Sequence, residues 1–172
     1  MKRIAVDMDG VLANVYSQFI DMHAAEFGEK IPWSEMDGKP EAAVFPNILS
    51  YVNSPGFFLH APLMDDCQAV LQEMNEKYKI YIVSAATEFP NSLTEKQSWL
   101  NIHFPFITWQ QMVFCGSKEI ISAEIMIDDH FKNLNFFNGE TFLFTQPHNK
   151  LSDPGKHKRI ETWKEIAQIF LS

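Results

Sequence analysis

A pair of aspartates at the end of a short apolar segment is the feature that most constrains how this chain can fold. Residues 4–6 have the apolar character of a buried strand, which ends at Asp7-Met8-Asp9-Gly10. In extended backbone, Asp7 and Asp9 point to the same side because strand side chains repeat every two residues. Adjacent carboxylates at a buried strand end repel each other and are costly to desolvate. The motif therefore favours a compensating cation such as Mg²⁺, with a solvated Asp-Gly turn as the simpler alternative.

The composition indicates one compact domain and limits the partners it can have. The chain has 172 residues, 46% of them hydrophobic, which is enough for a core of its own. A net charge of −8 argues against binding a nucleic-acid polymer, but a small phosphorylated substrate can be held by local cations. The two cysteines suggest no disulfide framework, so we expect a cytoplasmic protein. No apolar stretch is long enough to predict a membrane association, and the sequence leaves the oligomeric state open.

Apolar segments with strand character alternate with amphipathic segments along the chain. This alternation predicts an α/β fold, a Rossmann-like parallel sheet covered by helices on both faces. The remaining strands are expected at 79–83, 112–115, 124–127 and 141–144, and the main helices at about 13–28, 41–51, 64–78, 92–102 and 161–171.

Chemically active side chains follow four of the five predicted strands. In open parallel sheets, ligands bind beyond the carboxyl ends of the strands, so these side chains should meet at one edge. Taken singly, a serine there is an ordinary turn residue and a lysine an ordinary surface residue. Four such endings together are the strongest signal in the sequence. They are Asp7 with Asp9, Ser84, Lys118, and Asp128 with Asp129.

This set of groups is suited to cleaving a phosphate ester. Acids from two strands can hold Mg²⁺, while Ser84 and Lys118 can bind and neutralise a phosphate. Asp7 can attack phosphorus to form an aspartyl-phosphate. Asp9 can protonate the leaving oxygen and later activate water.

The long gap after the first strand predicts an inserted element. About 70 residues separate Gly10 from the second strand, although one crossover helix needs far fewer. We therefore expect a small helical cap at residues 15–61, inserted into a core made of residues 1–14 and 62–172.

Four sequence motifs resemble those of the haloacid dehalogenase superfamily of phosphohydrolases. They are DMDGVLA, IYIVSAAT, GSKEII and EIMIDDH, in the same order. Within that superfamily, the segments FFLHAPLMDD and SKEIISAEIMIDD are similar to the 5'(3')-deoxyribonucleotidase family. The match extends from about Arg3 to Asp129.

The resemblance implies specific roles for the predicted site residues. Asp7 would be the nucleophile and Asp9 the acid and base. Mg²⁺ would be held by the Asp7 side chain, the Asp9 main-chain carbonyl and one acid of the pair Asp128 and Asp129; the sequence does not say which. Ser84 and Lys118 would hold the transferring phosphate.

The resemblance also implies a substrate, a (deoxy)nucleoside monophosphate, and hence a hydrolase role in deoxyribonucleotide catabolism. Aromatic residues of the cap would cover the base, with Phe45 and Phe57 as candidates. Two alternatives stay open. The first is a phosphatase of the same superfamily for another small ester such as a sugar phosphate. The second is a receiver-like phosphoacceptor domain, although such domains are usually shorter and have no cap.

Overall fold

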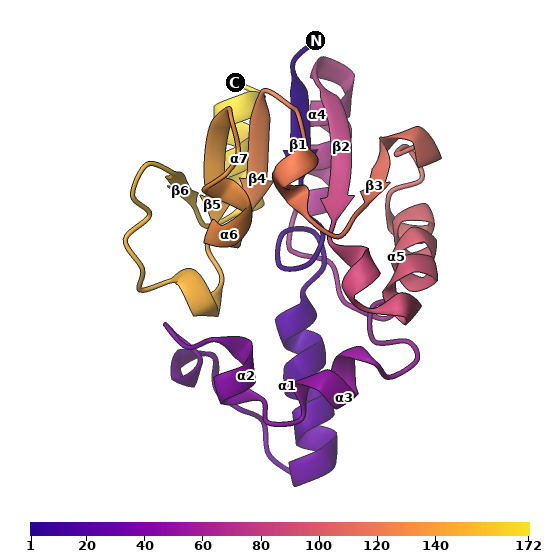
Figure 1. Ribbon diagram of the computed structural model, residues 1–172, viewed down its shortest axis with the longest axis vertical. Coiled ribbons are helices and arrows are strands. Elements are labelled where there is room, and N and C mark those ends of the chain that lie inside the picture. The colour runs from indigo at the N-terminus through magenta and orange to yellow at the C-terminus, as the bar shows by residue number, and fades with distance from the viewer.

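A parallel six-stranded sheet forms the centre of the computed structural model, which describes residues 1–172 (Figure 1). The strand order is β3-β2-β1-β4-β5-β6, and every pair of neighbours is parallel. The predicted α/β fold with a parallel sheet is therefore confirmed, with one strand more than expected. The strands are β1 (Arg3–Val6), β2 (Lys79–Ser84), β3 (Met112–Phe114), β4 (Ile125–Asp128), β5 (Glu140–Phe144) and β6 (Lys158–Ile160).

Both faces of the sheet are buried, and the alternation of side chains along β1 shows how. Ile4 and Val6 belong to an apolar cluster of 25 buried residues on one face, whereas Ala5 belongs to a cluster of eight on the other. This is the two-residue period of a strand with no solvent-exposed side. From residue 67 onward, the α-helices of the core are α4 (Cys67–Lys77), α5 (Pro90–His103), α6 (Phe131–Leu134) and α7 (Trp163–Phe170).

The segment between β1 and α4 contains a group of helices with an apolar cluster of its own, here called the lobe. The lobe lies beyond the carboxyl ends of the strands (Figure 1). Its first helix is fixed at both ends: the Asn14 side chain accepts a hydrogen bond from the Ser17 amide at 3.1 Å, and Gly28 ends the helix with φ +83°. The lobe contains α1 (Val15–Phe27), the 3₁₀ turn η1 (Trp33–Glu35), α2 (Glu41–Val44) and α3 (Ile48–Val52).

Two buried tryptophans anchor the connections between the core and the lobe. The indole N–H of Trp163 donates to the carbonyl of Val11 at 2.7 Å, just before the lobe begins. The indole N–H of Trp99 donates to the carbonyl of Ala61 at 2.7 Å, where the lobe ends. Both connections are thus tied to the core through buried hydrogen bonds.

Among the helices, none has the length and hydropathy that a membrane span requires.

The Trp163 anchor leads to a prediction about stability. Trp163→Phe keeps an aromatic ring but leaves the Val11 carbonyl without its partner, so the free energy of unfolding should fall by about 1–3 kcal/mol. Urea unfolding followed by circular dichroism measures the loss. Trp109→Phe is the matched control, because Trp109 is 74% exposed and should change stability by less than about 0.5 kcal/mol. Equal effects of the two substitutions would contradict a role for the buried hydrogen bond.

Candidate active site

The strand order brings the predicted site residues together at one edge of the sheet. β2, β1 and β4 are neighbours, so Ser84, Asp7 and Asp128 lie side by side where these strands end. Lys118 begins the 3₁₀ turn η4 (Lys118–Ile120), four residues after the last residue of β3. All four side chains are buried, as is Asp129.

Lys118 links two strands through their carboxylates. Its Nζ lies 2.5 Å from Oδ1 of Asp7 and 2.7 Å from Oδ2 of Asp128. Burial alone would lower the pKa of Lys118, but the charges of Asp128 and Asp7 raise it above its ordinary value. The lysine is therefore a fixed positive charge beside Asp7.

The two acids that the sequence could not tell apart have different environments. Oδ1 of Asp128 accepts hydrogen bonds from the His130 amide at 2.9 Å and from Asn133 at 3.0 Å, and Oδ2 accepts from Asn133 and Lys118. Oδ1 of Asp129 is buried and has no hydrogen-bond partner. Both oxygens of Asp128 are therefore engaged in hydrogen bonds, whereas Oδ1 of Asp129 is free to bind a ligand.

Asp9 is paired with Lys96, a residue the sequence analysis did not single out. Nζ of Lys96 lies 2.5 Å from Oδ2 of Asp9 and 2.9 Å from Oγ of Ser84, and the lysine is only 3% exposed. Lys96 comes from the middle of α5 and places a second buried cation beside the first strand. The other Asp9 oxygen, Oδ1, is buried without a partner.

The turn after β1 depends on Gly10. Its φ of +78° is in the left-handed region, and a Cβ at this position would collide with the Asp129 carboxylate. The carbonyl of Gly10 accepts a hydrogen bond from Gln146 at 2.5 Å. Glycine therefore allows the aspartate-bearing turn to approach the acid that follows β4.

The acidic cluster fits a divalent cation. Asp7, Asp128 and Asp129 each offer a carboxylate oxygen, and these atoms lie within 4.8 Å of one another. Burial raises the pKa of Asp7 well above its ordinary range and that of Asp129 to about 7. The unpartnered oxygen of Asp129, close to the carboxylate of Asp7, is of the donor type that hard cations such as Mg²⁺ prefer.

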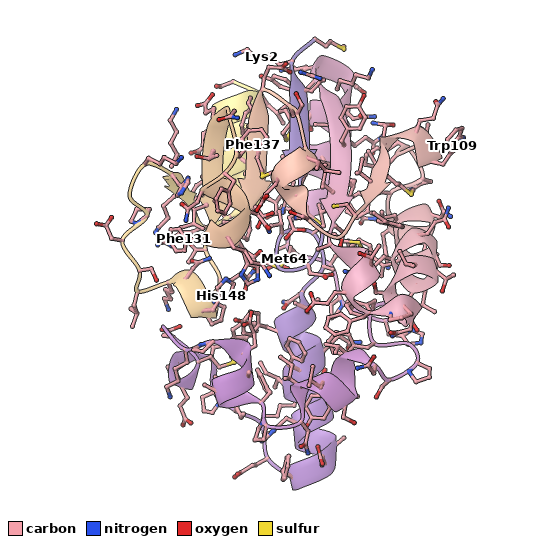
Figure 2. All side chains as sticks on the ribbon, in the orientation of Figure 1. Lys2, Met64, Trp109, Phe131, Phe137 and His148 are labelled. Atoms are coloured by element: carbon pink, nitrogen blue, oxygen red, sulfur yellow. The ribbon has the colours of Figure 1, made fainter.

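A second cluster, formed by histidines and Glu41, joins the lobe to the core. His148, labelled in Figure 2, lies on the side of the core that faces the lobe, with Nδ1 3.2 Å from Oε1 of Glu41. Its Nε2 lies 3.0 Å from the main-chain oxygen of Asp129. Burial would lower the pKa of His148, but the hydrogen bond to Glu41 and the charge of Asp129 raise it to about 9. A protonated His148 can therefore donate to both partners at neutral pH.

The same cluster is poorly arranged for a second metal. The rings of His130 and His148 stack at 4.3 Å between centroids and only 14° from parallel. Nitrogen lone pairs lie in the plane of each ring, so two nearly parallel rings cannot both aim at one ion. The cluster is better described as an ionic bridge between the lobe and the core.

Two adjoining cavities lie between the lobe and the strand ends. A charged cavity of about 120 Å³ is lined by the carboxylates of Asp7, Asp9 and Asp129 and by Lys96 and Lys118. An apolar cavity of about 280 Å³ lies next to it, and Asp9, Val15 and Phe89 line both. Phe57 lines the apolar cavity, whereas Phe45 is fully buried behind it with its ring centroid 5.3 Å from that of Phe19.

Solved structures with the same architecture identify the fold. A conserved haloacid dehalogenase-like protein of unknown function from Agrobacterium tumefaciens matches with a TM-score of 0.64 at 12% identity, covering 99% of this chain and 98% of that one. A Bacillus subtilis protein provisionally assigned as a haloacid dehalogenase-type hydrolase, solved bound to magnesium, matches with a TM-score of 0.60 at 12% identity over 99% of both chains. The fold is that of the haloacid dehalogenase class of hydrolases.

Sequence comparison identifies the family within that class. The family model described as 5' nucleotidase, deoxy (pyrimidine), cytosolic type C protein matches residues 1–172. The 5'(3')-deoxyribonucleotidase of Bacillus subtilis strain 168 is 35% identical over 173 residues, 99% of each chain. A Staphylococcus aureus strain Mu50 protein, provisionally named 5'(3')-deoxyribonucleotidase, is 37% identical over 176 residues, 99% of this chain and 96% of that one. The chain belongs to this 5'-nucleotidase family and is an enzyme, a phosphoric monoester hydrolase.

Proposed function

We propose that the enzyme hydrolyses deoxyribonucleoside monophosphates in a Mg²⁺-dependent reaction with an aspartyl-phosphate intermediate. The observation that carries the proposal is the contact between a charged cavity and an apolar cavity. The first suits a phosphate and the second suits the flat apolar face of a nucleobase. The names of the relatives point to the same substrate class.

Asp7 is the nucleophile in this scheme. One of its oxygens bonds to phosphorus as the bond from phosphorus to the leaving oxygen breaks. Asp9 gives its proton to the leaving oxygen, so the nucleoside departs as a neutral alcohol. Asp9 then takes a proton from a water that attacks phosphorus, which releases inorganic phosphate and restores the Asp7 carboxylate.

The lysines and Ser84 hold the group that is transferred. Lys118 orients Asp7 through the 2.5 Å contact and supplies positive charge to the phosphate oxygens. Lys96 and Ser84, which are already joined at 2.9 Å, bind the phosphate from the β2 side. A phosphate bound there competes with Asp9 for the Lys96 ammonium, which leaves Asp9 free to carry a proton.

The carboxylates at the strand ends would hold the cation. We assign the Asp7 side chain, the Asp9 main-chain carbonyl and Asp129 as direct ligands, because the unpartnered oxygen of Asp129 is available. Asp128 instead orients Lys118, since all its lone pairs are engaged. When bound, Mg²⁺ neutralises negative charge on the phosphate and on the attacking carboxylate.

Residues 15–61 act as the cap in this proposal, with residues 1–14 and 62–172 as the catalytic core. Phe57 forms part of the wall that covers the base, because it lines the apolar cavity. Phe45 supports this wall from within the lobe. The cap thus selects the nucleoside while the core performs the chemistry.

A panel of phosphate esters tests the substrate class. Phosphate release with Mg²⁺ is measured for 5'- and 3'-deoxyribonucleotides, ribonucleotides and sugar phosphates. We expect kcat/KM to be highest for a deoxyribonucleotide. A sugar phosphate whose kcat/KM exceeds that of every deoxyribonucleotide would replace the proposal with the sugar-phosphate alternative.

Metal removal tests the role of the acidic cluster. Treatment with EDTA should abolish phosphate release, and excess Mg²⁺ should restore it, because the buried carboxylates would otherwise repel the phosphate. EDTA already saturated with Mg²⁺ is the control and should have no effect. Turnover that persists in EDTA after dialysis would contradict the metal requirement.

A further inference from the structure

The carboxylate of Glu95 holds the segment through which the chain leaves the lobe. Its Oε1 accepts a hydrogen bond from the Gly56 amide at 2.8 Å, and its Oε2 accepts from the amides of Phe58 at 3.1 Å and Leu59 at 3.3 Å. One side chain on α5 therefore satisfies three backbone donors of the return segment (residues 53–61). Hydrogen bonds to an ionised acceptor are stronger than neutral ones.

This return segment forms a wall of the apolar cavity. It contains no helix or strand, only turns, and it needs the φ of +87° at Gly56. Phe57 and Phe58 line the cavity and are 2% and 3% exposed. Because turns do not fix their own position as a regular element does, the placement of these two rings depends on what holds the backbone.

The next residue of the same helix, Lys96, connects this wall to the charged cavity. Its Nζ lies 4.5 Å above the ring of Phe58, besides its contacts with Asp9 and Ser84. Neighbouring residues of α5 thus fix the charged end of the site and the aromatic wall. Any shift of the return segment would change the distance between the two.

We infer that Glu95 is a positioning residue for the nucleoside part of the substrate. It acts through Phe57 and Phe58 by fixing their distance from the phosphate, and it takes no part in the chemistry. This inference rests on the proposed function, because it assigns the apolar cavity to the base.

The test compares one substitution on two substrates. Glu95→Gln keeps the side-chain shape but has one acceptor oxygen, and its amide N–H groups face backbone N–H groups. We expect KM for a deoxyribonucleoside 5'-monophosphate to rise by about tenfold or more, with kcat changed by less than about twofold. The KM of deoxyribose 5-phosphate, which lacks a base, and the inhibition constant of inorganic phosphate should not change. Glu73→Gln, the same substitution at an exposed position of α4, is the control.

Hydrogen exchange supplies a second measurement, because the amides of Phe58 and Leu59 should exchange faster in the Glu95→Gln variant than in the wild type. Faster exchange with an unchanged nucleotide KM would overturn the inference. Equal losses with the nucleotide, the base-free ester and inorganic phosphate would also overturn it, because they indicate general damage. The proposed function fails separately, if the wild type itself does not prefer the nucleotide to deoxyribose 5-phosphate.

Discussion

Asp7→Asn is expected to lower kcat by about 10⁴-fold or more, because an amide cannot act as the nucleophile that a carboxylate provides. The substitution should preserve the fold. Asparagine has the same shape, its oxygen can still accept a hydrogen bond from Lys118, and Lys118 keeps Asp128 as its charged partner. Loss of activity without loss of structure would identify a chemical role rather than a structural one.

Rapid quenching with a labelled substrate measures the intermediate directly. Wild-type enzyme should carry covalent phosphate on the peptide that contains Asp7, and the variant should carry none. Asp21→Asn is the matched control, since this carboxylate is exposed on α1 and pairs only with exposed Lys30. Mass spectrometry must first verify that the variant still has asparagine at position 7. If its kcat is then within about tenfold of the wild-type value, Asp7 is excluded as the nucleophile.

The predicted site residues that the structure brings together are those whose position follows from topology. Once a parallel sheet is inferred, the ends of its strands must lie at one edge, so Asp7, Ser84 and Asp128 could be brought together without coordinates. The sequence could not distinguish the environments of Asp128 and Asp129. The choice depends on which oxygens are already hydrogen-bonded, and in particular on Asn133, which lies on the next helix.

Lys96 was missed although the sequence carried a signal for it. The buried positions of α5 are Ser92, Lys96, Trp99 and Leu100, which is the spacing of a helical face. A lysine on such a face requires an acidic partner, and the only indication was its position in the apolar stripe. His148 had no comparable signal, because it lies in a three-residue 3₁₀ turn (Pro147–Asn149), which is too short to show a periodicity from which to infer side-chain direction.

Strand β6 was missed for another reason. It is a three-residue edge strand with two charged residues, so it lacks the apolar run that identifies the other strands in the sequence. Charged residues are common on edge strands because they prevent pairing with other chains.

The sequence alone does not distinguish Phe45 from Phe57. Only the packing places Phe45 in the lobe interior and Phe57 at the cavity.

Lys118→Met should lower kcat/KM by about 10²–10³-fold, because it removes a fixed positive charge that lies beside the nucleophile. Methionine fills similar space without a charge. Two buried carboxylates then lose their cation, so stability at pH 8 without metal should fall by about 3–5 kcal/mol. Urea unfolding in EDTA measures this effect separately from activity.

The pH dependence of that loss has a definite sign. Lys118 lowers the pKa of Asp7, which burial already holds above its ordinary value, so removing the lysine raises this pKa further. A carboxyl whose pKa is higher in the folded than in the unfolded state binds more protons when folded. The free energy of unfolding therefore falls as the pH rises from the unfolded pKa to the folded one. We expect the difference between variant and wild type to be largest at pH 8 and to shrink as the pH is lowered toward 5.

Lys30→Met separates this behaviour from a general loss of charge. Lys30 also pairs with an aspartate, at 2.8 Å, but both side chains are exposed, so its removal should cost no more than about 1 kcal/mol and show little pH dependence. If the position-118 variant behaved like this control in activity and in stability, Lys118 would be neither a phosphate-binding group nor the partner that makes the buried carboxylates tolerable. If Lys118 has both roles, only the position-118 variant should lose stability strongly, and this loss of unfolding free energy should shrink as the pH is lowered.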